Sequence, residues 1–398
     1  MADTPSHGPN VYPSHLSPVP THTPPQLSNS PTPNAPTTDA QALEFRYIHS
    51  VGFAELLELL GISLFVSTYQ AGKLMVVQGS QGKLSTLLRN FEQVMGIALG
   101  GDRLAIGSRK QVHFFDNVPN VGSQLEPDAC HDAYYVPRRS HVTSDIRVHE
   151  MVWINNELWL VNTRFSCLCT LYPDYSFMPK WRPSFVSALA PEDRCHLNGI
   201  AVVNGKPKYV SCFSPTDTPQ GWRDRKVNGG CVIDLTTNDI IAEGFAMPHS
   251  PRVYANNNTN DPEYKQGQGP IPEKRLWLLD SGRGHLVTLD PMTGVGTVVA
   301  ELPGFTRGLA FYDRYAFVGL SQIREKETFG GLPIEDKVDE LKCGIWVVDI
   351  YTGQSVAFLE FQQGCTELFD IQILPNSCNP MVLGFQRDTL NNAFILPI

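Results

Sequence analysis

The sequence predicts an all-β protein, a six-bladed β-propeller closed by strands from both ends of the chain. Three observations lead to this prediction. A pattern of strand, polar turn and apolar strand, clearest at 306–321, recurs at intervals of roughly 50 to 60 residues, a spacing typical of propeller blades. The early strands lack an innermost partner, which the last recurrence supplies. The turn Asp-x-x-Thr-Gly ends two outer strands, at 290–294 and 349–353, and indicates a structural repeat.

The recurrences define the blades in chain order. Their innermost strands start near Met95, His149, Asn198, His249, Arg307 and Phe369. Residues 64–69, 73–78 and 83–88 have the composition of three further strands separated by glycine-containing turns. We expect these three strands to share one blade with the strand at Phe369, because such a blade has no open edge. At most one more strand is expected near the C-terminus, at 381–385.

A short helix is predicted ahead of these strands, which leaves no room for a seventh blade. Between residues 52 and 60 the apolar side chains lie on one helical face, and Gly61 follows at the position of a helix C-cap. Residues 1–40 hold ten of the 31 prolines. Such a segment buries too little apolar surface to offset its ordering entropy. We therefore expect a disordered tail over 1–40 and a propeller domain over 41–398.

Composition excludes several classes of protein. A net charge of -9 without a basic run argues against a nucleic-acid binder. No apolar stretch is long enough to span a membrane, and no secretory signal is visible at the N-terminus. Nine cysteines without a C-x-x-C pair indicate reduced thiols. We therefore expect a cytoplasmic protein, and we expect it to be a monomer.

Alignment of the recurrences places polar side chains in one register. The starts of innermost strands converge on the central channel of a propeller, so residues far apart in sequence face one another there. The position after each start carries Gly96, Glu150, Gly199, Ser250, Gly308 and Asp370. His196 and Glu367 each lie two residues before a strand start and point to the same side of the chain.

These residue types suit the binding of a small anion. An arginine such as Arg307 matches a carboxylate or phosphate group. A histidine beside a carboxylate can act as a general base, and the carboxylate can orient it. The hypothesis is a small-molecule site with hydrolase or lyase-type chemistry, although the sequence leaves open whether the protein is an enzyme. The candidate catalytic residues are His149, His249 and Glu150, and the candidate ligand-binding residues are Asn198, Arg307, Asp370 and His196.

Other interpretations stay open at this point. The polar groups could simply satisfy one another at the lip of a wet channel. They could also hold a divalent metal, since imidazole ligands suit a transition metal and oxygen ligands suit calcium. No metal-spacing motif, nucleophile elbow, P-loop or dinucleotide fingerprint is present. A protein-interaction scaffold that binds partners across its loop face is the main alternative class.

Several segments resemble a known family. Residues 65–74, 196–199, 248–252, 278–284 and 305–309 are similar to the hallmark segments of uncharacterised bacterial proteins, common in cyanobacteria and proteobacteria, that share a conserved domain of unknown function. The resemblance covers about residues 45–398 and implies a propeller without an established activity. More distantly, the Asn-Gly-Ile strand start at 198–200 resembles gluconolactonase and paraoxonase-like six-bladed propellers, which implies a channel metal held by Asn, Asp and Glu.

Overall fold

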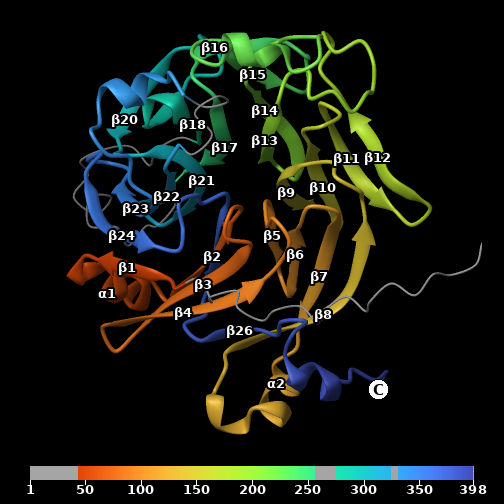
Figure 1. Ribbon diagram of the computed structural model, residues 1–398, viewed down its shortest axis with the longest axis vertical. Helices are drawn as coiled ribbons and strands as arrows, with labels where there is room; N and C mark the ends of the chain where they lie inside the picture. The colour runs from red at the N-terminus through yellow and green to blue at the C-terminus, as the bar shows by residue number, and fades with distance from the viewer. Residues whose placement is uncertain (1–43, 256–273, 324–329, 398) are drawn as a thin grey trace, which may run out of the picture. The chain divides into compact units, whose positions relative to one another are not determined.

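Six small sheets form a ring in the computed structural model, which describes residues 44–255, 274–323 and 330–397 (Figure 1). The prediction of a six-bladed β-propeller is confirmed. We number the blades from the one that contains the first three strands of the ring. The predicted tail, residues 1–40, lies outside the described residues. Within those residues, no helix has the length and apolar character needed to cross a bilayer.

Five blades are built from consecutive antiparallel strands, with the first strand of each blade innermost. Blade 2 contains β5 (Ile97–Gly100), β6 (Arg103–Gly107), β7 (Gln111–Asn117) and β8 (Ala133–Val142). Blade 3 contains β9 (Val148–Ile154), β10 (Glu157–Asn162), β11 (Cys167–Tyr172) and β12 (Tyr175–Trp181). Blade 4 contains β13 (Leu197–Val203), β14 (Lys206–Cys212), β15 (Gly230–Asp234) and β16 (Ile240–Phe245). Blade 5 contains β17 (Pro248–Tyr254), β18 (Arg275–Asp280), β19 (His285–Leu289) and β20 (Gly296–Glu301). Blade 6 contains β21 (Phe305–Tyr312), β22 (Tyr315–Ser321), β23 (Gly344–Asp349) and β24 (Ser355–Gln363).

Blade 1 is shared by the two ends of the chain, as predicted. Its strands are β2 (Ile62–Thr68), β3 (Lys73–Ser80), β4 (Lys83–Asn90) and the innermost β25 (Ile371–Pro375). Strand β25 pairs antiparallel with β2. The ring is therefore closed by hydrogen bonds between segments about 300 residues apart, and neither end leaves a half-blade open.

Each end of the chain also adds a strand to a blade next to blade 1. Strand β1 (Arg46–His49) pairs with the outer strand β24 of blade 6. Strand β26 (Pro380–Val382) pairs in parallel with the outer strand β8 of blade 2. The sequence did not predict β1, and it predicted a final strand at 381–385 without this partner. The two additions link blade 1 to both of its neighbours along their outer edges.

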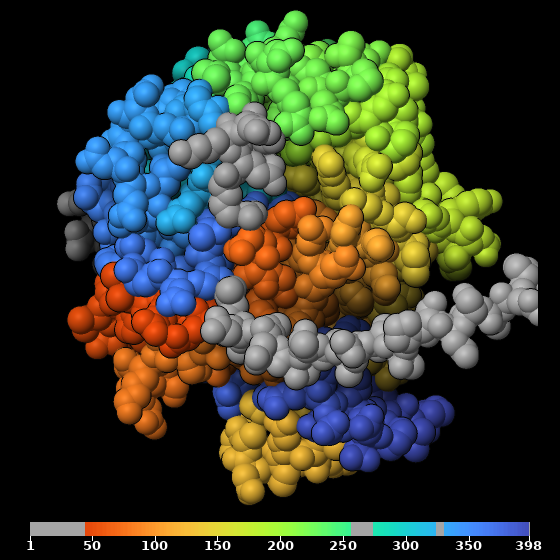
Figure 2. Space-filling view, in the orientation of Figure 1, coloured from red at the N-terminus to blue at the C-terminus, as the bar shows by residue number. Residues whose placement is uncertain are grey.

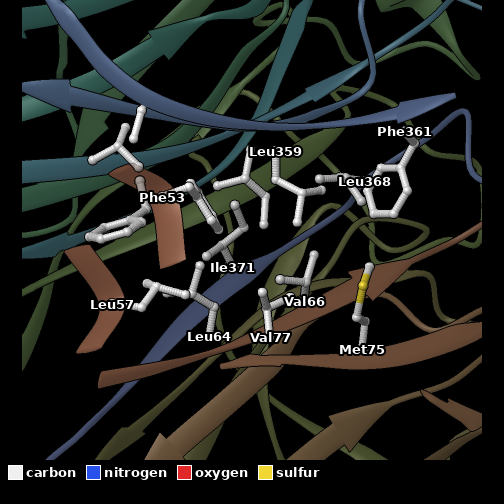
Figure 3. Close-up of a cluster of buried hydrophobic side chains, with 14 of the residues drawn as sticks. Phe53, Leu57, Leu64, Val66, Met75, Val77, Leu359, Phe361, Leu368 and Ile371 are labelled. Atoms are coloured by element: carbon white, nitrogen blue, oxygen red, sulfur yellow. The ribbon is translucent and has the colours of Figure 1, made fainter. Parts of the chain in front are cut away.

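Helix α1 (Val51–Leu60) fills the junction between blades 6 and 1, and confirms the predicted helix. Its residues Phe53 and Leu57 are fully buried in a cluster with Leu64 of β2 and Leu359 of β24 (Figure 3). The helix ends at Gly61, where the backbone is left-handed with a φ of 63° and the amide donates to the Glu58 carbonyl. Apolar burial therefore fixes α1 at this junction.

A second helix, α2 (Pro119–Leu125), belongs to the insertion between β7 and β8. The segment that follows β26 packs on it, and Figure 2 shows this blue segment against the gold one. Val121 and Leu125 of α2 share an apolar cluster with Leu390. This contact extends the link between the C-terminal segment and blade 2.

The repeated Asp-led turns have the geometry that their sequence predicts. The Asp290 carboxylate accepts the amide of Met292 at 2.8 Å, and the Asp349 carboxylate accepts the amide of Tyr351 at 3.0 Å. The glycines that end these turns have φ values of 73° and 71°, which glycine adopts without strain. These aspartates are therefore structural.

Candidate functional site

A cavity of about 330 Å³ lies at the channel mouth, where the starts of the innermost strands meet. Its wall includes three residues of the predicted set, His149, His196 and Arg307. Glu367 and Phe369, from the segment that leads into β25, lie beside them. The volume is at the small end of the roughly 300 to 1,000 Å³ that small-molecule pockets occupy.

The other predicted residues line a second, smaller cavity that shares His149 and Arg307 with the first. These residues are Glu150, Asn198, His249 and Asp370. The smaller cavity has a volume of about 10 Å³, which is close to the minimum for one water molecule. The structure therefore brings all seven predicted residues into one neighbourhood, from five different blades.

The Arg307 guanidinium is held on two edges and one face. One terminal nitrogen donates to Oε1 of Glu367 at 2.9 Å, and the other donates to Nε2 of His149 at 3.2 Å. Its central carbon lies 3.7 Å from the centre of the Phe369 ring. The side chain is only 9% exposed. A planar cation in this setting has a fixed direction, so little conformational entropy remains to be lost when a ligand binds.

The hydrogen bonds of His149 identify its tautomer. Its Nδ1 lies 2.8 Å from the Thr163 hydroxyl, and that hydroxyl donates its own proton to the Leu197 carbonyl. Nδ1 must therefore carry the proton, and Nε2 is the acceptor that Arg307 needs. Nδ1 of His249 also carries the proton, because it lies 3.0 Å from the carbonyl of Met247, which can only accept a hydrogen bond.

His196 forms a pair with Asp193 that the sequence analysis missed. Its Nδ1 lies 2.9 and 3.0 Å from the two carboxylate oxygens, so this nitrogen carries the proton. Asp193 also accepts a hydrogen bond from Arg147 at 3.1 Å. The His196 ring is stacked on Phe213 at 4.2 Å and contacts Trp222 at 4.5 Å, measured between ring centres. The imidazole is therefore fixed in both tautomer and orientation.

All three imidazoles are neutral at pH 7, because burial lowers their pKa values. The pKa values of His149 and His249 lie well below the ordinary 6.5, and the neighbouring Arg307 guanidinium lowers them further. The pKa of His196 is also lowered, because burial outweighs the opposing effect of the Asp193 carboxylate. Each ring therefore has an unprotonated Nε2.

Glu150 and Asp370 hold neighbouring blades together. Glu150 accepts the backbone amide of Ile200 in blade 4 at 2.7 Å and forms an ion pair with Arg252. Asp370 accepts the amide of Ile97 in blade 2 at 2.9 Å. Burial, and next the charge of Glu150, raises the pKa of Asp370 to about 7. Both carboxyl groups thus have structural partners in the next blade.

The glycines that alternate with these acidic residues allow neighbouring innermost strands to approach one another closely. A Cβ added at Gly199 would lie 2.2 Å from Cδ of Pro251 and 3.1 Å from Oε2 of Glu150. A Cβ added at Gly96 would lie 3.1 Å from Cα of Glu150. The register of small and acidic residues seen in the sequence is therefore a packing pattern between innermost strands.

Several cavity residues escaped the sequence analysis although their register was available. The position two residues before each strand start gave His196 and Glu367, and the same position gives Gln93, Arg147 and Phe305. All five line the cavity, because alternate residues of an extended chain face one side. Two more lining residues, Trp222 and Arg223, come from the short helix η2 (Gly221–Arg225) in the insertion before β15. No pattern in the sequence signals Asp193, whereas Trp222 lies in a long insertion rich in proline, aromatic and basic residues, a composition typical of binding loops.

The donor set does not favour a metal. Among the described residues, no group of three or more His, Cys, Asp or Glu side chains is arranged to hold an ion. Nε2 of His149 already receives a hydrogen bond from the Arg307 guanidinium, which carries a positive charge that a metal ion would have to displace. The oxygen ligands among the candidate residues are Glu150, Asn198 and Asp370. The two carboxylates accept backbone amides, and the Asn198 oxygen accepts the Ser211 hydroxyl.

Comparison with known proteins identifies a family but no activity. The family model described as Domain of unknown function (DUF4915) matches residues 51–259 and 271–383. No curated protein matches the chain. The fold is similar to a chain in the crystal structure of a nidogen/laminin complex, with 11% identity, a TM-score of 0.44, and coverage of 80% of this chain and 100% of that chain. It is also similar to a protein of unknown function from Bacteroides caccae, with 10% identity, a TM-score of 0.48, and coverage of 79% of this chain and 98% of that chain.

Proposed function

Because the chain belongs to DUF4915, a family with no assigned activity, we propose its function from the site itself. The protein binds a small anionic molecule in the cavity at the channel mouth. The observation that carries this proposal is Arg307, a nearly buried guanidinium held in a fixed direction in the wall of a 330 Å³ cavity. A planar cation of this kind matches the paired oxygens of a carboxylate or phosphate group.

The charges around the cavity support the same ligand. Among the described residues, four arginines and two carboxyl groups line it, although the protein as a whole has a net charge of -9. The lining charges are Arg109, Arg147, Arg223 and Arg307 against Asp145 and Glu367. A cationic cleft in an acidic protein raises the local concentration of small anions.

We further propose that any chemistry here is acid-base chemistry of the hydrolase or lyase type, with His196 as the base. Its Nδ1 proton is bound by Asp193, its Nε2 is unprotonated, and the residue lines the cavity. This is the arrangement in which an imidazole removes a proton from a bound molecule or from water. His149 is less suited to this role, because its Nε2 already accepts from Arg307.

A scaffold function would favour a continuous apolar patch on the loop face. The insertions 122–145 and 168–194 expose Val142, Tyr172 and Tyr175, but two fully described loops that contribute residues to the cavity wall, 182–196 and 213–229, expose only Leu189 and Val227 among their large apolar residues. The large aromatic residue of the second loop, Trp222, is instead buried against His196. These two loops therefore favour a ligand cavity over a docking surface.

A cytoplasmic location fits the cysteines. All nine are free thiols, including two pairs that are close in space. The sulfur atoms of Cys212 and Cys231 are 3.3 Å apart, and those of Cys343 and Cys365 are 3.9 Å apart. Together with the absence of a C-x-x-C pair in the sequence, these buried thiols support our proposal of a reducing compartment.

Thermal unfolding with a panel of anions tests the proposed function. The panel contains inorganic phosphate, acetate, succinate, malate and gluconate, and the variant is Arg307→Gln combined with Glu367→Gln. The double change removes both charges of the Arg307–Glu367 pair, so that neither is left buried without the other. We expect at least one anion to stabilise the native protein, by about 2.7 kcal/mol at a concentration of 100 times its Kd. The double variant should fold and show no such shift.

The control is Arg103→Gln, which removes the same charge outside the cavity, where Arg103 bonds Asn156. It should respond to anions as the native protein does. Equal stabilisation of the native protein and the double variant would contradict the role of Arg307. Absence of any anion effect on the native protein would contradict the proposed function.

A further inference from the structure

We propose that the bound anion carries a hydroxyl group close to its charged end, and that Nε2 of His196 accepts a hydrogen bond from this hydroxyl. The ligand class is then a small hydroxy acid. This inference rests on the proposed anion site and adds to it a second point of recognition, which the Asp193–His196 pair provides.

The neighbours of His196 fix the position of its ring proton. Asp193 binds the Nδ1 proton through two oxygens, at 2.9 and 3.0 Å, and Arg147 holds the carboxylate in place. The opposite nitrogen, Nε2, is consequently a hydrogen-bond acceptor. Within the described residues no hydrogen bond uses it, although the side chain is only 8% exposed and lines the cavity.

Only a hydrogen-bond donor can satisfy Nε2 of His196. A carboxylate or phosphate offers mainly oxygen acceptors at neutral pH, and its lone pairs would face the lone pair of Nε2. Protonation of the imidazole would remove the conflict, but burial and the neighbouring cations oppose it. An acceptor that a bound ligand shields from water without offering a donor is costly, by about 1 to 3 kcal/mol. A ligand hydroxyl supplies the missing donor.

The two recognition points are the Arg307 guanidinium and Nε2 of His196. The Arg307 guanidinium bonds His149, and the ring centres of His149 and His196 are 4.8 Å apart in an edge-to-face contact. One imidazole therefore separates the cation from the free acceptor. A ligand that reaches both groups has its hydroxyl near its charged end, as in a hydroxy acid.

The charged and titratable groups around His196 set the expected pH dependence. They come from its own loop and from three other blades, and they are Asp193, Arg147, Arg307, His149 and His249. Because the pKa of His196 is lowered, the ring is neutral at pH 7 and becomes protonated only in more acidic solution. Protonation removes the acceptor and adds a positive charge. Hydroxy-acid binding should therefore weaken as the pH falls, whereas binding of a simple anion should strengthen.

Titration calorimetry with matched ligands tests the inference. The pairs are malate with succinate and lactate with propionate, which differ in one hydroxyl group. We expect the hydroxy acid of a pair to bind at least about tenfold more tightly at pH 7.5, because a site built for a hydroxyl rejects the analogue that lacks it. We also expect the preference to shrink as the pH is lowered toward 5.

Two variants test whether the Asp193–His196 pair causes the preference for hydroxy acids. In Asp193→Asn the introduced amide can donate to Nδ1, which moves the ring proton to Nε2 and removes the acceptor. In His196→Phe the ring still packs on Phe213 but has no acceptor. Either variant should bring the affinity ratio of malate to succinate close to one. The control Asp290→Asn removes the same charge from an outer turn and should leave the ratio unchanged.

The outcomes separate the two proposals. Succinate and propionate binding as tightly as their hydroxy partners would overturn the inference and leave the anion site standing. A hydroxyl preference that survives both variants would also overturn it. If none of the four ligands binds and phosphate does not bind either, the proposed function is overturned as well. The pH dependence of hydroxy-acid binding, measured on the native protein, tests the role of His196 even if both variants fail to fold.

Discussion

Replacing Asp370 by asparagine should make the stability of the protein less dependent on pH. Asp370 accepts the amide of Ile97 across the junction between blades 1 and 2, and an amide oxygen can accept the same bond. Its pKa is raised to about 7 from an ordinary 3.8 by burial and by the Glu150 charge. Between these values the native state binds one more proton than the unfolded state, so its stability falls as the pH rises.

The size of the effect follows from the pKa shift. One pKa unit corresponds to about 1.4 kcal/mol. Between pH 5 and pH 8 the native state keeps the extra proton of Asp370 over about two pH units. The variant Asp370→Asn should therefore gain about 3 kcal/mol relative to the native protein over this range. Urea unfolding at pH 5, 6, 7 and 8 measures the gain.

The control for this experiment is Asp290→Asn, in an exposed turn. The pKa of Asp290 is lowered by the hydrogen bond from the Met292 amide, so its contribution to stability is complete above its ordinary pKa and constant from pH 5 to pH 8. The difference between this variant and the native protein should be flat. If the curve for Asp370→Asn is equally flat, Asp370 is not a buried carboxyl group and the description of the blade junction is refuted.

Three further predictions concern the scaffold. Gly199→Ala should cost about 1 to 3 kcal/mol in urea unfolding, because the new Cβ would meet Pro251 at 2.2 Å, whereas Gly52→Ala on open helix surface should cost nothing. Equal effects of the two changes would contradict close packing of the innermost strands. Phe53→Ala should cost about 3 to 5 kcal/mol if α1 is fixed by burial, and a loss below about 1 kcal/mol would contradict that role. Limited proteolysis should remove residues 1–40 and leave one cooperative, strand-rich unit, and two separately melting fragments would refute a single propeller domain.

The recurring pattern predicts the ring well, because it reflects the backbone at the innermost strands. The observed starts of these strands are Ile97, Val148, Leu197, Pro248, Phe305 and Ile371, each within two residues of the expected position. Glycines and polar residues occur there for a physical reason, since six strands converge and only some positions can carry a side chain. A packing constraint that repeats in every blade is visible in one sequence.

Features that occur once leave no such trace. Strand β1 has four residues at the outer edge of blade 6, too few for a periodic signal. Asp193 lies in a loop with a φ of 51°, and its partnership with His196 depends on how that loop folds. The roles of Glu150 and Asp370 could not be separated from those of the histidines, because the register shows which residues converge and not which way a carboxyl group turns.

The shared construction of blade 1 also sets the order in which the protein matures during synthesis. All strands of blades 2 to 6 are made before β25, so these sheets can form while the ring is still open. Glu367 and Phe369, which hold Arg307 on two sides, arrive only with the segment that leads into β25. The cavity at the channel mouth is therefore completed only near the end of synthesis, when β25 is made. A molecule that fills it binds only the closed ring, so its presence in the cell favours the finished protein over every open intermediate.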